Sequence, residues 1–307
     1  MASDISFIRE MDFAYGVVDR VSPSIRRVIA RNPGPFTFHG TGTYIVGRGR
    51  VAVIDPGPSI AEHVEALLAA VAGETVTHIL VTHTHLDHSP AAEAFKRATG
   101  APTCGFGPHS PGRYWSKMGQ GGSPGGDFAF APDVLLRDGD EIAGPGWTLE
   151  AFHTPGHCAN HLCFALKEES TLFSGDQVMG WSTTVVSPPD GDMREYMDSL
   201  RRLLGRGEAV YWPTHGPAIA EPKRHVEALI AHREQREIEI AKALADGLNQ
   251  IPEIVARLYA DIPEKLHHAA ARTVLSHLVH MIETERVTCD GPPAPTSTYT
   301  LLGRDRI

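Results

Sequence analysis

The chain has 307 residues, of which 42 % are apolar, and a formal net charge of −9 at pH 7. Its length predicts a main domain with a smaller one, and its apolar fraction is normal for a soluble globular protein with a large core. The acidic balance argues against a general binder of nucleic acid or of anionic membranes, and no uninterrupted apolar run reaches membrane-spanning length.

The first elements are predicted from short apolar patterns. Residues 1–38 are mixed in character and are expected to form a loosely structured lead-in. Two β-rich runs, 43–46 and 50–55, flank Gly47-Arg48-Gly49 and predict a hairpin. Apolar residues at helical spacing then predict a helix over 60–72, and the run at 78–82 predicts a buried strand.

Potential metal ligands crowd the short loop that follows this strand. They are His83, His85, Asp87 and His88. Ser89-Pro90 then begins a helix that is expected to end at Gly100. Imidazole and carboxylate groups are the usual ligands of zinc and similar ions, so their density between a strand end and a helix start predicts a metal site.

The middle of the chain combines a long loop with several strands. Residues 105–127 are rich in Gly, Ser and Pro and predict a functional cover or a disordered loop, in which Tyr114 and Trp115 are candidates for a lid. Strands are predicted at 134–136, 147–152, 161–166, 171–174 and 209–212, with a helix at 193–204.

From Glu221 the pattern becomes helical. Helices are predicted at 221–246, 251–259 and 264–285, followed by two strands around a Pro-rich turn between 288 and 302. Three helices and a β-hairpin in this order are typical of a winged-helix module. The chain is therefore expected to divide into domains of residues 1–221 and 222–307.

Three more candidate ligands stand at predicted strand ends, each close to a glycine that suits a turn: His157, Asp176 and His215. Because these strands belong to the same apparent sheet system, we expect their ends to converge on the first group of ligands. Together the two groups provide enough side chains for two metal ions.

These motifs resemble those of the metallo-β-lactamase superfamily over about residues 35–220. The resemblance implies an α/β fold, a four-layer αββα sandwich with a binuclear metal site on one edge. It also implies two ligand sets that share one bridging carboxylate: His83, His85 and His157 for one ion; Asp87, His88 and His215 for the other; and Asp176 between them.

One branch of this superfamily is especially similar, the branch that contains the endoribonuclease called β-lactamase-like protein two. The similar segments are residues 36–38, 42–44, 154–157 and 183–184, together with the helical tail. Members of the branch carry a winged-helix-like C-terminal extension. Cys158 stands where threonine is common, and the 105–127 loop is longer and differently composed; these departures concern the substrate and leave the metal site unchanged.

The implied chemistry is hydrolysis by a metal-bridging hydroxide. Two Zn²⁺ ions, or Mn²⁺ or Fe²⁺ in their place, lower the pKa of water from ~15.7 toward ~7, so no serine or cysteine nucleophile is needed. Asp87 and Asp176 are the carboxylates expected to act in catalysis. The resemblance favours phosphodiester cleavage of single-stranded RNA or of an unknown small molecule. Thioester hydrolysis of the glyoxalase II kind and weak β-lactamase activity stay open as alternatives.

Four residues are candidates for roles around the site. Asp55, at a strand end, resembles the family's supporting aspartate, which braces the ligand loop. His161 opens an apolar strand and is a candidate either to protonate a leaving group or to pack behind the ligands. Thr183 and Thr184 follow Asp176 in a loop and are candidates to line the pocket.

A non-enzymatic alternative is a winged-helix DNA-binding regulator. The predicted recognition helix has few basic residues, Lys265 and Arg272, whereas a reader of duplex DNA needs a basic face. We therefore expect the tail to form a dimerisation surface or a wall of the active site and not to bind duplex DNA specifically. Its histidines are expected in the core or on a helix face and not in a second metal site: His267, His268, His277 and His280.

Two features indicate a cytoplasmic protein. Charged residues near the start, including Arg9 and Glu10, interrupt any signal-peptide pattern. The cysteines lack the spacing of a disulfide framework and are expected to be reduced: Cys104, Cys158, Cys163 and Cys289.

Overall fold

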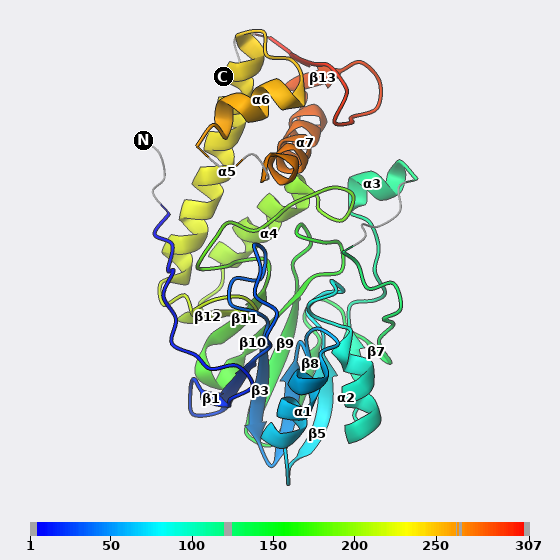
Figure 1. Cartoon of the computed structure of the whole chain (residues 1–307), viewed down its shortest axis with the longest axis vertical. Coiled ribbons are helices and arrows are strands. Elements are labelled where there is room, and N and C mark those ends of the chain that lie inside the picture. The colour runs from blue at the N-terminus through cyan, green and yellow to red at the C-terminus, as the bar shows by residue number, and fades with distance from the viewer. Residues whose placement is uncertain (1–4, 120–124, 262, 264–265, 304–307) are drawn as a thin grey trace.

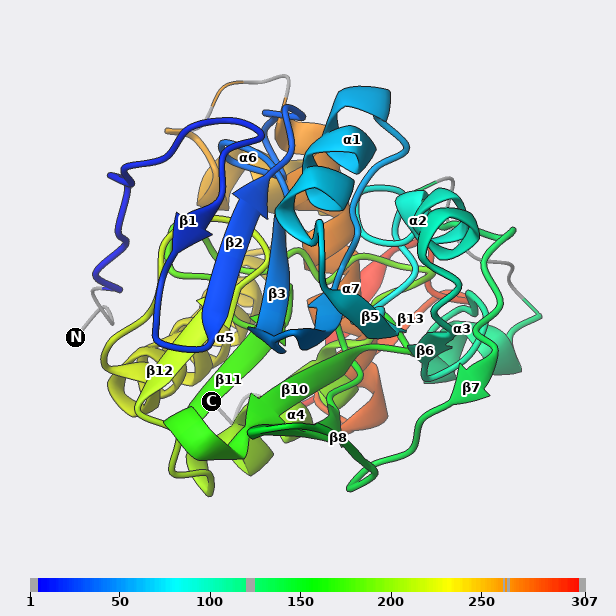
Figure 2. The same cartoon turned by 90° about the horizontal axis from the view of Figure 1, so that it is seen from below.

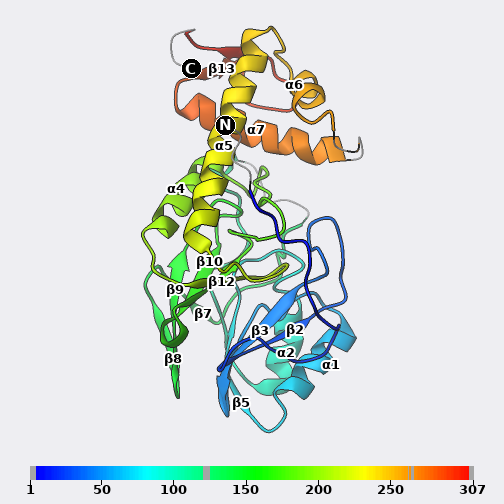
Figure 3. The ribbon, with the colours of Figure 1, turned by 90° about the vertical axis from the view of Figure 1, so that its left-hand side faces the viewer.

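The computed structural model describes residues 5–119, 125–261, 263 and 266–303. Two β-sheets lie face to face with helices on both outer faces, and a helical module caps one end of this sandwich (Figure 1). The view from the side shows the two sheets and the long helix that leads into the module (Figure 3). The predicted four-layer αββα sandwich is confirmed.

The first sheet is formed by the N-terminal half of the described residues. Its strands, in spatial order, are β1 (Asp19–Arg20), β2 (Ile25–Ile29), β3 (Gly42–Arg48), β4 (Arg50–Ile54), β5 (Thr75–Leu80), β6 (Thr103–Gly105) and β7 (Val134–Leu135). β1 to β4 are antiparallel, which confirms the predicted hairpin of β3 and β4, and β4 to β7 are parallel. Crossover helix α1 (Ala61–Ala70) joins β4 to β5, and α2 (Ala91–Thr99) joins β5 to β6.

The second sheet is formed by the next part of the chain. Its strands, in spatial order, are β12 (Val210–Pro213), β11 (Thr171–Gly175), β10 (Leu162–Leu166), β9 (Trp147–His153) and β8 (Glu141–Gly144). A short 3-10 turn, Lys167–Glu169, joins β10 to β11. Helix α4 (Met193–Leu204) and the first half of α5 (Pro222–Ala245) cover its outer face. Seen from below, the two sheets lie between α1 and α2 on one side and α4 and α5 on the other (Figure 2).

Alternation of side chains along the strands builds the core. Tyr44 and Ile54 point inward and pack against Phe164 and Phe173 of the second sheet, whereas Ile45 and Val53 point outward, under α1 and α2. Because successive strand residues face opposite sides, an apolar strand packs against the other sheet on one side and against the outer helices on the other. The inter-sheet core therefore fixes how the strand ends of one sheet lie against those of the other.

The C-terminal module has the predicted order of helices and strands. After α5 come α6 (Ile251–Leu258), α7 (His267–Glu283) and the antiparallel pair of β13 (Val287–Cys289) and β14 (Tyr299–Leu301). Gly247, with φ of +89°, follows the end of α5 in the left-handed conformation that favours glycine. The first two residues of the predicted 264–285 helix lie outside the described residues.

Two sequence predictions were wrong in the first half of the chain. The lead-in contains strand β2, which the sequence hides because Arg26 and Arg27 interrupt its apolar pattern. Their charges are paired with Glu74 at 2.6 Å and with Asp19 at 2.8 Å, partners that only folding brings near. Strand β8 was also missed, since it is a short edge strand with one buried residue, Ile142.

The 105–127 segment is more ordered than predicted, although residues 120–124 lie outside the described residues. It contains helix α3 (Arg113–Lys117). Trp115 is only 8 % exposed and packs into the core of the C-terminal module, so it does not form a lid. Within the described part of the chain, no helix has the length and apolarity to cross a bilayer.

Candidate metal centre

The strand directions bring the predicted ligands to one edge of the sandwich. β9 and β11 are each antiparallel to β10 and therefore run in the same direction, and β12 is parallel to β11. The chain segments that leave these three strands carry His157, Asp176 and His215. The loop after β5 brings the remaining ligands from the first sheet.

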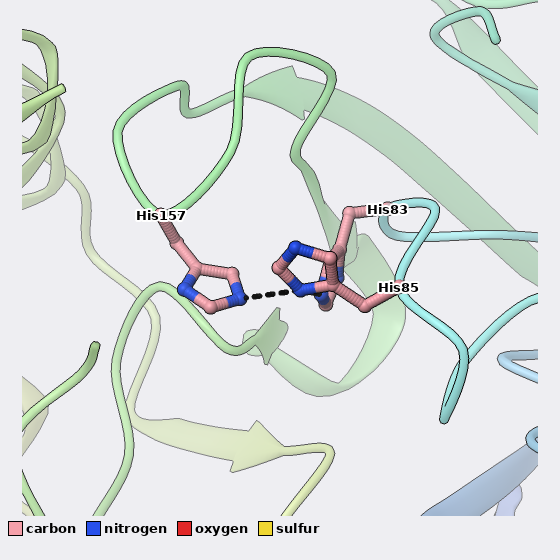
Figure 4. A group of neighbouring side chains, drawn as sticks. All are labelled: His83, His85 and His157. Atoms are coloured by element: carbon pink, nitrogen blue, oxygen red, sulfur yellow. Dashed lines mark hydrogen bonds between the residues drawn. The ribbon is translucent and has the colours of Figure 1, made fainter. Parts of the chain in front are cut away.

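The first group consists of His83, His85 and His157. His85 Nδ1 lies 3.0 Å from His83 Nε2 and 3.0 Å from His157 Nε2. Figure 4 shows His157 reaching from its loop toward the other two rings, which come from the loop after β5. Three imidazole nitrogens thus converge on one point.

The second group consists of Asp87, His88 and His215. His215 Nε2 is 3.1 Å from Asp87 Oδ2, and His88 Nε2 is 3.6 Å from Asp87 Oδ1. Asp176 lies between the groups, because its carboxylate is 3.5 Å from His215, 3.6 Å from His88 and 3.7 Å from His157. All seven predicted ligands are therefore brought together.

The polar atoms of this cluster fit a metal ion. His88 Nε2, His215 Nε2 and Asp176 Oδ1 are buried and have no hydrogen-bond partner in the protein. Buried polar atoms are nearly always paired, so three such atoms aimed at one place indicate a cation. Nitrogen and carboxylate oxygen donors suit zinc, manganese or iron.

Asp55 holds the outer side of the second group, as the sequence predicted for a bracing aspartate. Its carboxylate has no exposed surface and lies 2.9 Å from His88 Nδ1. It also accepts the backbone N–H and the hydroxyl of Thr82, both at 2.7 Å, and the hydroxyl of Thr214 at 2.9 Å. A carboxylate at Nδ1 orients the ring so that Nε2 faces the cluster.

The other histidines are also oriented from behind. His157 Nδ1 donates to the carbonyl of Val185 at 2.6 Å, and His215 Nδ1 lies 3.2 Å from the carbonyl of Gly40. His85 Nε2 is 3.1 Å from Asp190, whose other carboxylate oxygen is 3.1 Å from His109. Each contact leaves the opposite nitrogen free to face the cluster.

The electrostatics of the cluster favour positive charge beside its carboxylates. Burial raises the pKa of Asp176, but His215 and His88 outweigh it and hold that pKa below its usual range. Burial and the neighbouring His85 lower the pKa of His157 to about 4. For His88, burial lowers the pKa, yet Asp87, Asp176 and Asp55 together raise it well above its ordinary value. The carboxylates that favour a proton on His88 also favour a metal cation beside it.

His161 is placed behind the cluster and not in it. Its ring is fully buried; Nε2 accepts the backbone N–H of Asp176 at 3.1 Å, and Nδ1 lies 2.9 Å from the hydroxyl of Thr154. Burial lowers its pKa well below the ordinary value, so the ring is neutral. With both nitrogens engaged, His161 fits the packed role that the sequence left open and does not fit proton donation to a leaving group.

The two threonines differ. Thr184 is buried, and its hydroxyl donates to the carbonyls of Asp176 at 2.8 Å and Gln177 at 3.1 Å. Thr183 is partly exposed, and its carbonyl accepts from Ser182. Thr184 therefore supports the backbone of Asp176 from outside the cluster.

Sequence reasoning missed Asp190, which holds His85, and His109, which contacts Asp190. Asp190 follows two prolines in an irregular segment, and His109 lies in the glycine-rich loop, far away in the chain. Neither residue has a local pattern that marks it. Their pairing depends on the approach of two loops, which no spacing in the sequence encodes.

Comparison with known proteins identifies the family. Residues 37–215 match the metallo-beta-lactamase superfamily, and residues 251–292 match the beta-lactamase associated winged helix domain. The chain is 32 % identical to a "Beta-lactamase-like protein 2 homolog" of Caenorhabditis elegans, over 84 % of this chain and 83 % of that protein. It is 34 % identical to an "Atrochrysone carboxyl ACP thioesterase" of Aspergillus fumigatus, over 80 % of this chain and 76 % of that protein.

The fold agrees with a solved structure. A beta-lactamase domain protein from Burkholderia ambifaria superposes with a TM-score of 0.77 at 18 % identity, covering 95 % of this chain and 96 % of that one. This likeness concerns the fold alone. With the sandwich, the cluster of histidines and aspartates, and both domain matches, the chain belongs to the metallo-β-lactamase superfamily and carries a winged-helix domain at its C-terminal side.

Proposed function

We propose that this protein is a hydrolase that uses two divalent metal ions, with thioesters as its preferred substrates. The observation that carries the proposal is the convergence of seven buried or half-buried ligands, three of whose polar atoms make no hydrogen bond within the protein. Members of the superfamily are generally hydrolases, and a cluster of this composition suits that chemistry.

In this proposal His83, His85 and His157 hold one ion, and Asp87, His88 and His215 hold the other, with Asp176 between them. Bound metal ions supply an acidified water as nucleophile and polarise the scissile bond. Asp87 is 26 % exposed and His85 18 %, whereas the other ligands have at most 9 % of their side chains exposed. Substrate is therefore expected to enter beside Asp87.

The cysteines are poor candidates for the nucleophile. Cys158 and Cys163 are fully buried, and burial raises the pKa of Cys158 well above its ordinary value and that of Cys163 to about 12. A thiol that stays protonated is a weak nucleophile. This supports hydrolysis by water and agrees with the expectation that no cysteine nucleophile is needed.

Thioesters are favoured by the surroundings of the open side. Leu86, between two ligands, is 51 % exposed, and Phe128 is 61 % exposed with its ring centre 4.8 Å from that of His109. Such apolar side chains suit an acyl group. The thioesterase name of the Aspergillus fumigatus relative points to the same class.

Phosphodiesters are the second candidate, supported by the resemblance to the endoribonuclease branch. The state of the nearby arginines is the reason that phosphodiesters rank below thioesters. Arg113 binds both carboxylate oxygens of Glu283, and Arg272 donates to the carbonyl of Pro188. Guanidinium groups that are already engaged are less available to a phosphate backbone.

The metal requirement is tested by elemental analysis and one substitution. From the resemblance to the family, the purified protein loaded with zinc or manganese is expected to hold about two ions per chain. Asp176→Ala is expected to lower turnover at least ~10³-fold, because both ligand groups lose their shared carboxylate. Asp198→Ala, an exposed carboxylate on α4, is the control and should keep full turnover. A metal-free protein after loading, or full turnover in Asp176→Ala, would contradict the proposal.

The substrate class is tested by a panel on the metal-loaded protein. An acyl thioester, a glutathione thioester, single-stranded RNA, an activated phosphodiester and a chromogenic cephalosporin are compared, each with the Asp176→Ala control. We expect the highest kcat/KM on an acyl thioester. A higher value on RNA or on the activated phosphodiester would reverse the ranking of the two candidates.

A further inference from the structure

One irregular segment, residues 184–192, contacts the metal cluster at three points. The hydroxyl of Thr184 donates to the carbonyl of Asp176 at 2.8 Å, and the carbonyl of Val185 accepts from His157 at 2.6 Å. Asp190 faces His85 Nε2 at 3.1 Å. The segment contains no helix or strand, and its own backbone hydrogen bond joins Gly191 N–H to the carbonyl of Ser187 at 2.8 Å. Its shape therefore depends largely on contacts with other parts of the chain.

Two arginines, one at the middle of α5 and one on α7 of the C-terminal module, hold this segment from the other side. Arg233 of α5 donates to the carbonyl of Thr184, and Arg272 of α7 donates to the carbonyl of Pro188. Arg233 is only 3 % exposed, and its guanidinium lies over the ring of Tyr196, 5.2 Å from the ring centre. Both arginines thus act on backbone atoms of the residues that orient the ligands.

The path from module to ligand is short. Thr184 receives Arg233 at its carbonyl and holds the backbone of Asp176 with its hydroxyl. Pro188 receives Arg272, and two residues later Asp190 holds His85. In Figure 1 the module caps the end of the sandwich where the ligand-bearing loops emerge.

We propose that Arg233 and Arg272 are positioning residues of the metal centre, through which the C-terminal winged-helix module orients His85, His157 and Asp176. The sandwich supplies the ligands, and the module sets their directions through segment 184–192. The inference rests on the proposed function, since it assumes that the cluster binds metal.

Cobalt binding to the full-length metal-free protein tests this directly. Co²⁺ is titrated and followed by its visible absorption, and its affinity is measured by competition with a chelator. We expect Arg233→Met and Arg272→Met each to lower Co²⁺ affinity at least ~10-fold and to change the band shape, because outer hydrogen bonds tune ligand geometry. Arg272→Lys retains a donor and should recover part of the loss.

Arg236→Met is the matched control. Arg236 lies one turn after Arg233 on α5 and likewise donates to a carbonyl, that of Leu258 at 3.4 Å, but inside the module. Its removal should leave Co²⁺ affinity and spectrum unchanged. If Arg233→Met fails to fold, Arg272→Met and Thr184→Val, which removes the hydroxyl links to the carbonyls of Asp176 and Gln177, carry the test.

The outcomes separate the two proposals. Unchanged affinity and spectrum in both Arg272→Met and Thr184→Val would overturn the positioning role, and so would an equal loss in Arg236→Met. A full-length protein that does not bind Co²⁺ at all would overturn the metal-dependent function itself and the positioning role with it. Loss in the variants but not in Arg236→Met supports both.

Discussion

At the scale of single residues, Asp55 shows how the ligand loop is held. Its backbone has a φ of +50°, a left-handed conformation that aspartate and asparagine tolerate better than most residues. Its buried carboxylate meets Thr82, Thr214 and His88 at once. Four donor groups from three residues leave this carboxylate little freedom, so the direction of His88 is determined by residues from three separate strand ends.

Asp55→Asn is expected to keep the backbone conformation but to weaken the metal centre. The amide nitrogen cannot accept a hydrogen bond, so at least one buried donor loses its partner. We expect metal affinity to fall about 10–100-fold and the free energy of unfolding to fall by about 1–3 kcal/mol. Chelator competition and urea unfolding measure these two quantities.

Asp133→Asn is the control for Asp55→Asn. Asp133 also accepts the backbone N–H and the hydroxyl of one threonine, Thr103, at 2.8 Å each, but its partner outside this pair is the exposed Lys96. Its substitution should leave metal affinity unchanged. Equal losses of metal affinity in the two variants would mean that Asp55 has no specific role at the cluster.

At the scale of elements, α5 and α7 contact each other through buried titratable side chains. His277 of α7 has no exposed surface, and its Nδ1 lies 3.2 Å from Glu237 of α5. His280 and Arg286 bind the same carboxylate. Burial lowers the pKa of His277 to about 4 from its ordinary 6.5, because desolvation outweighs the pull of Glu237.

This pairing predicts acid sensitivity of the module. Between pH 6.5 and 4 the unfolded chain binds a proton on His277 that the folded chain excludes, so the free energy of unfolding falls as the pH falls, by up to about 3 kcal/mol. The pKa of Glu237 is held below its usual range: burial raises it, but His277 and His280 outweigh that effect. The stability that ionised Glu237 contributes is lost only at pH values below about 4.5, and this loss also lowers the free energy of unfolding as the pH falls.

Urea unfolding at several pH values checks this prediction. His277→Gln retains an N–H donor for Glu237 and does not titrate, so the fall in stability between pH 6.5 and 4 should be smaller than in the unchanged protein. The difference between the two proteins isolates His277 from the histidines of the metal cluster. Identical pH profiles would show that His277 is not responsible.

At the scale of the whole molecule, α5 belongs to two cores. Val226 and Leu229 in its first half pack with α4 and the second sheet, and Ile240 and Leu244 in its second half pack with α6 and α7. α3 adds a second link, since Arg113 binds Glu283 of α7 at 2.7 Å. The predicted domain limit at residue 221 would therefore cut away side chains that cover the sandwich.

Truncation tests that limit. A chain ending after residue 221 loses Val226 and Leu229, each of whose burial contributes about 1.5–3 kcal/mol, and should unfold at least ~10 °C lower than the full chain. A chain ending after Ala245 retains both side chains and should be more stable than the shorter one. Circular dichroism recorded during heating measures the unfolding midpoints of the three chains. Equal midpoints for the shorter and the full chain would contradict this expectation.

Much of the architecture could be predicted from local patterns. The β3–β4 hairpin follows from its glycine turn, and the helices from 3.6-residue periodicity. Strand β2 could not be predicted, because Arg26 and Arg27 are compatible with a buried strand only once Glu74 and Asp19 lie beside them. The burial of Trp115 in the C-terminal core was equally hidden, since its neighbours follow it by more than a hundred residues.

The sequence alone determined which side chains can bind metal and on which strand ends they stand, because ligand type and strand or turn preference are local properties of the chain. Only the tertiary structure decided what orients those side chains: the Asp190–His85 and Asp55–His88 pairs, the engaged nitrogens of His161, and the arginines that hold segment 184–192. These contacts join residues that are distant along the chain. Their geometry depends on how two sheets and a helical module pack, which no single stretch of sequence encodes.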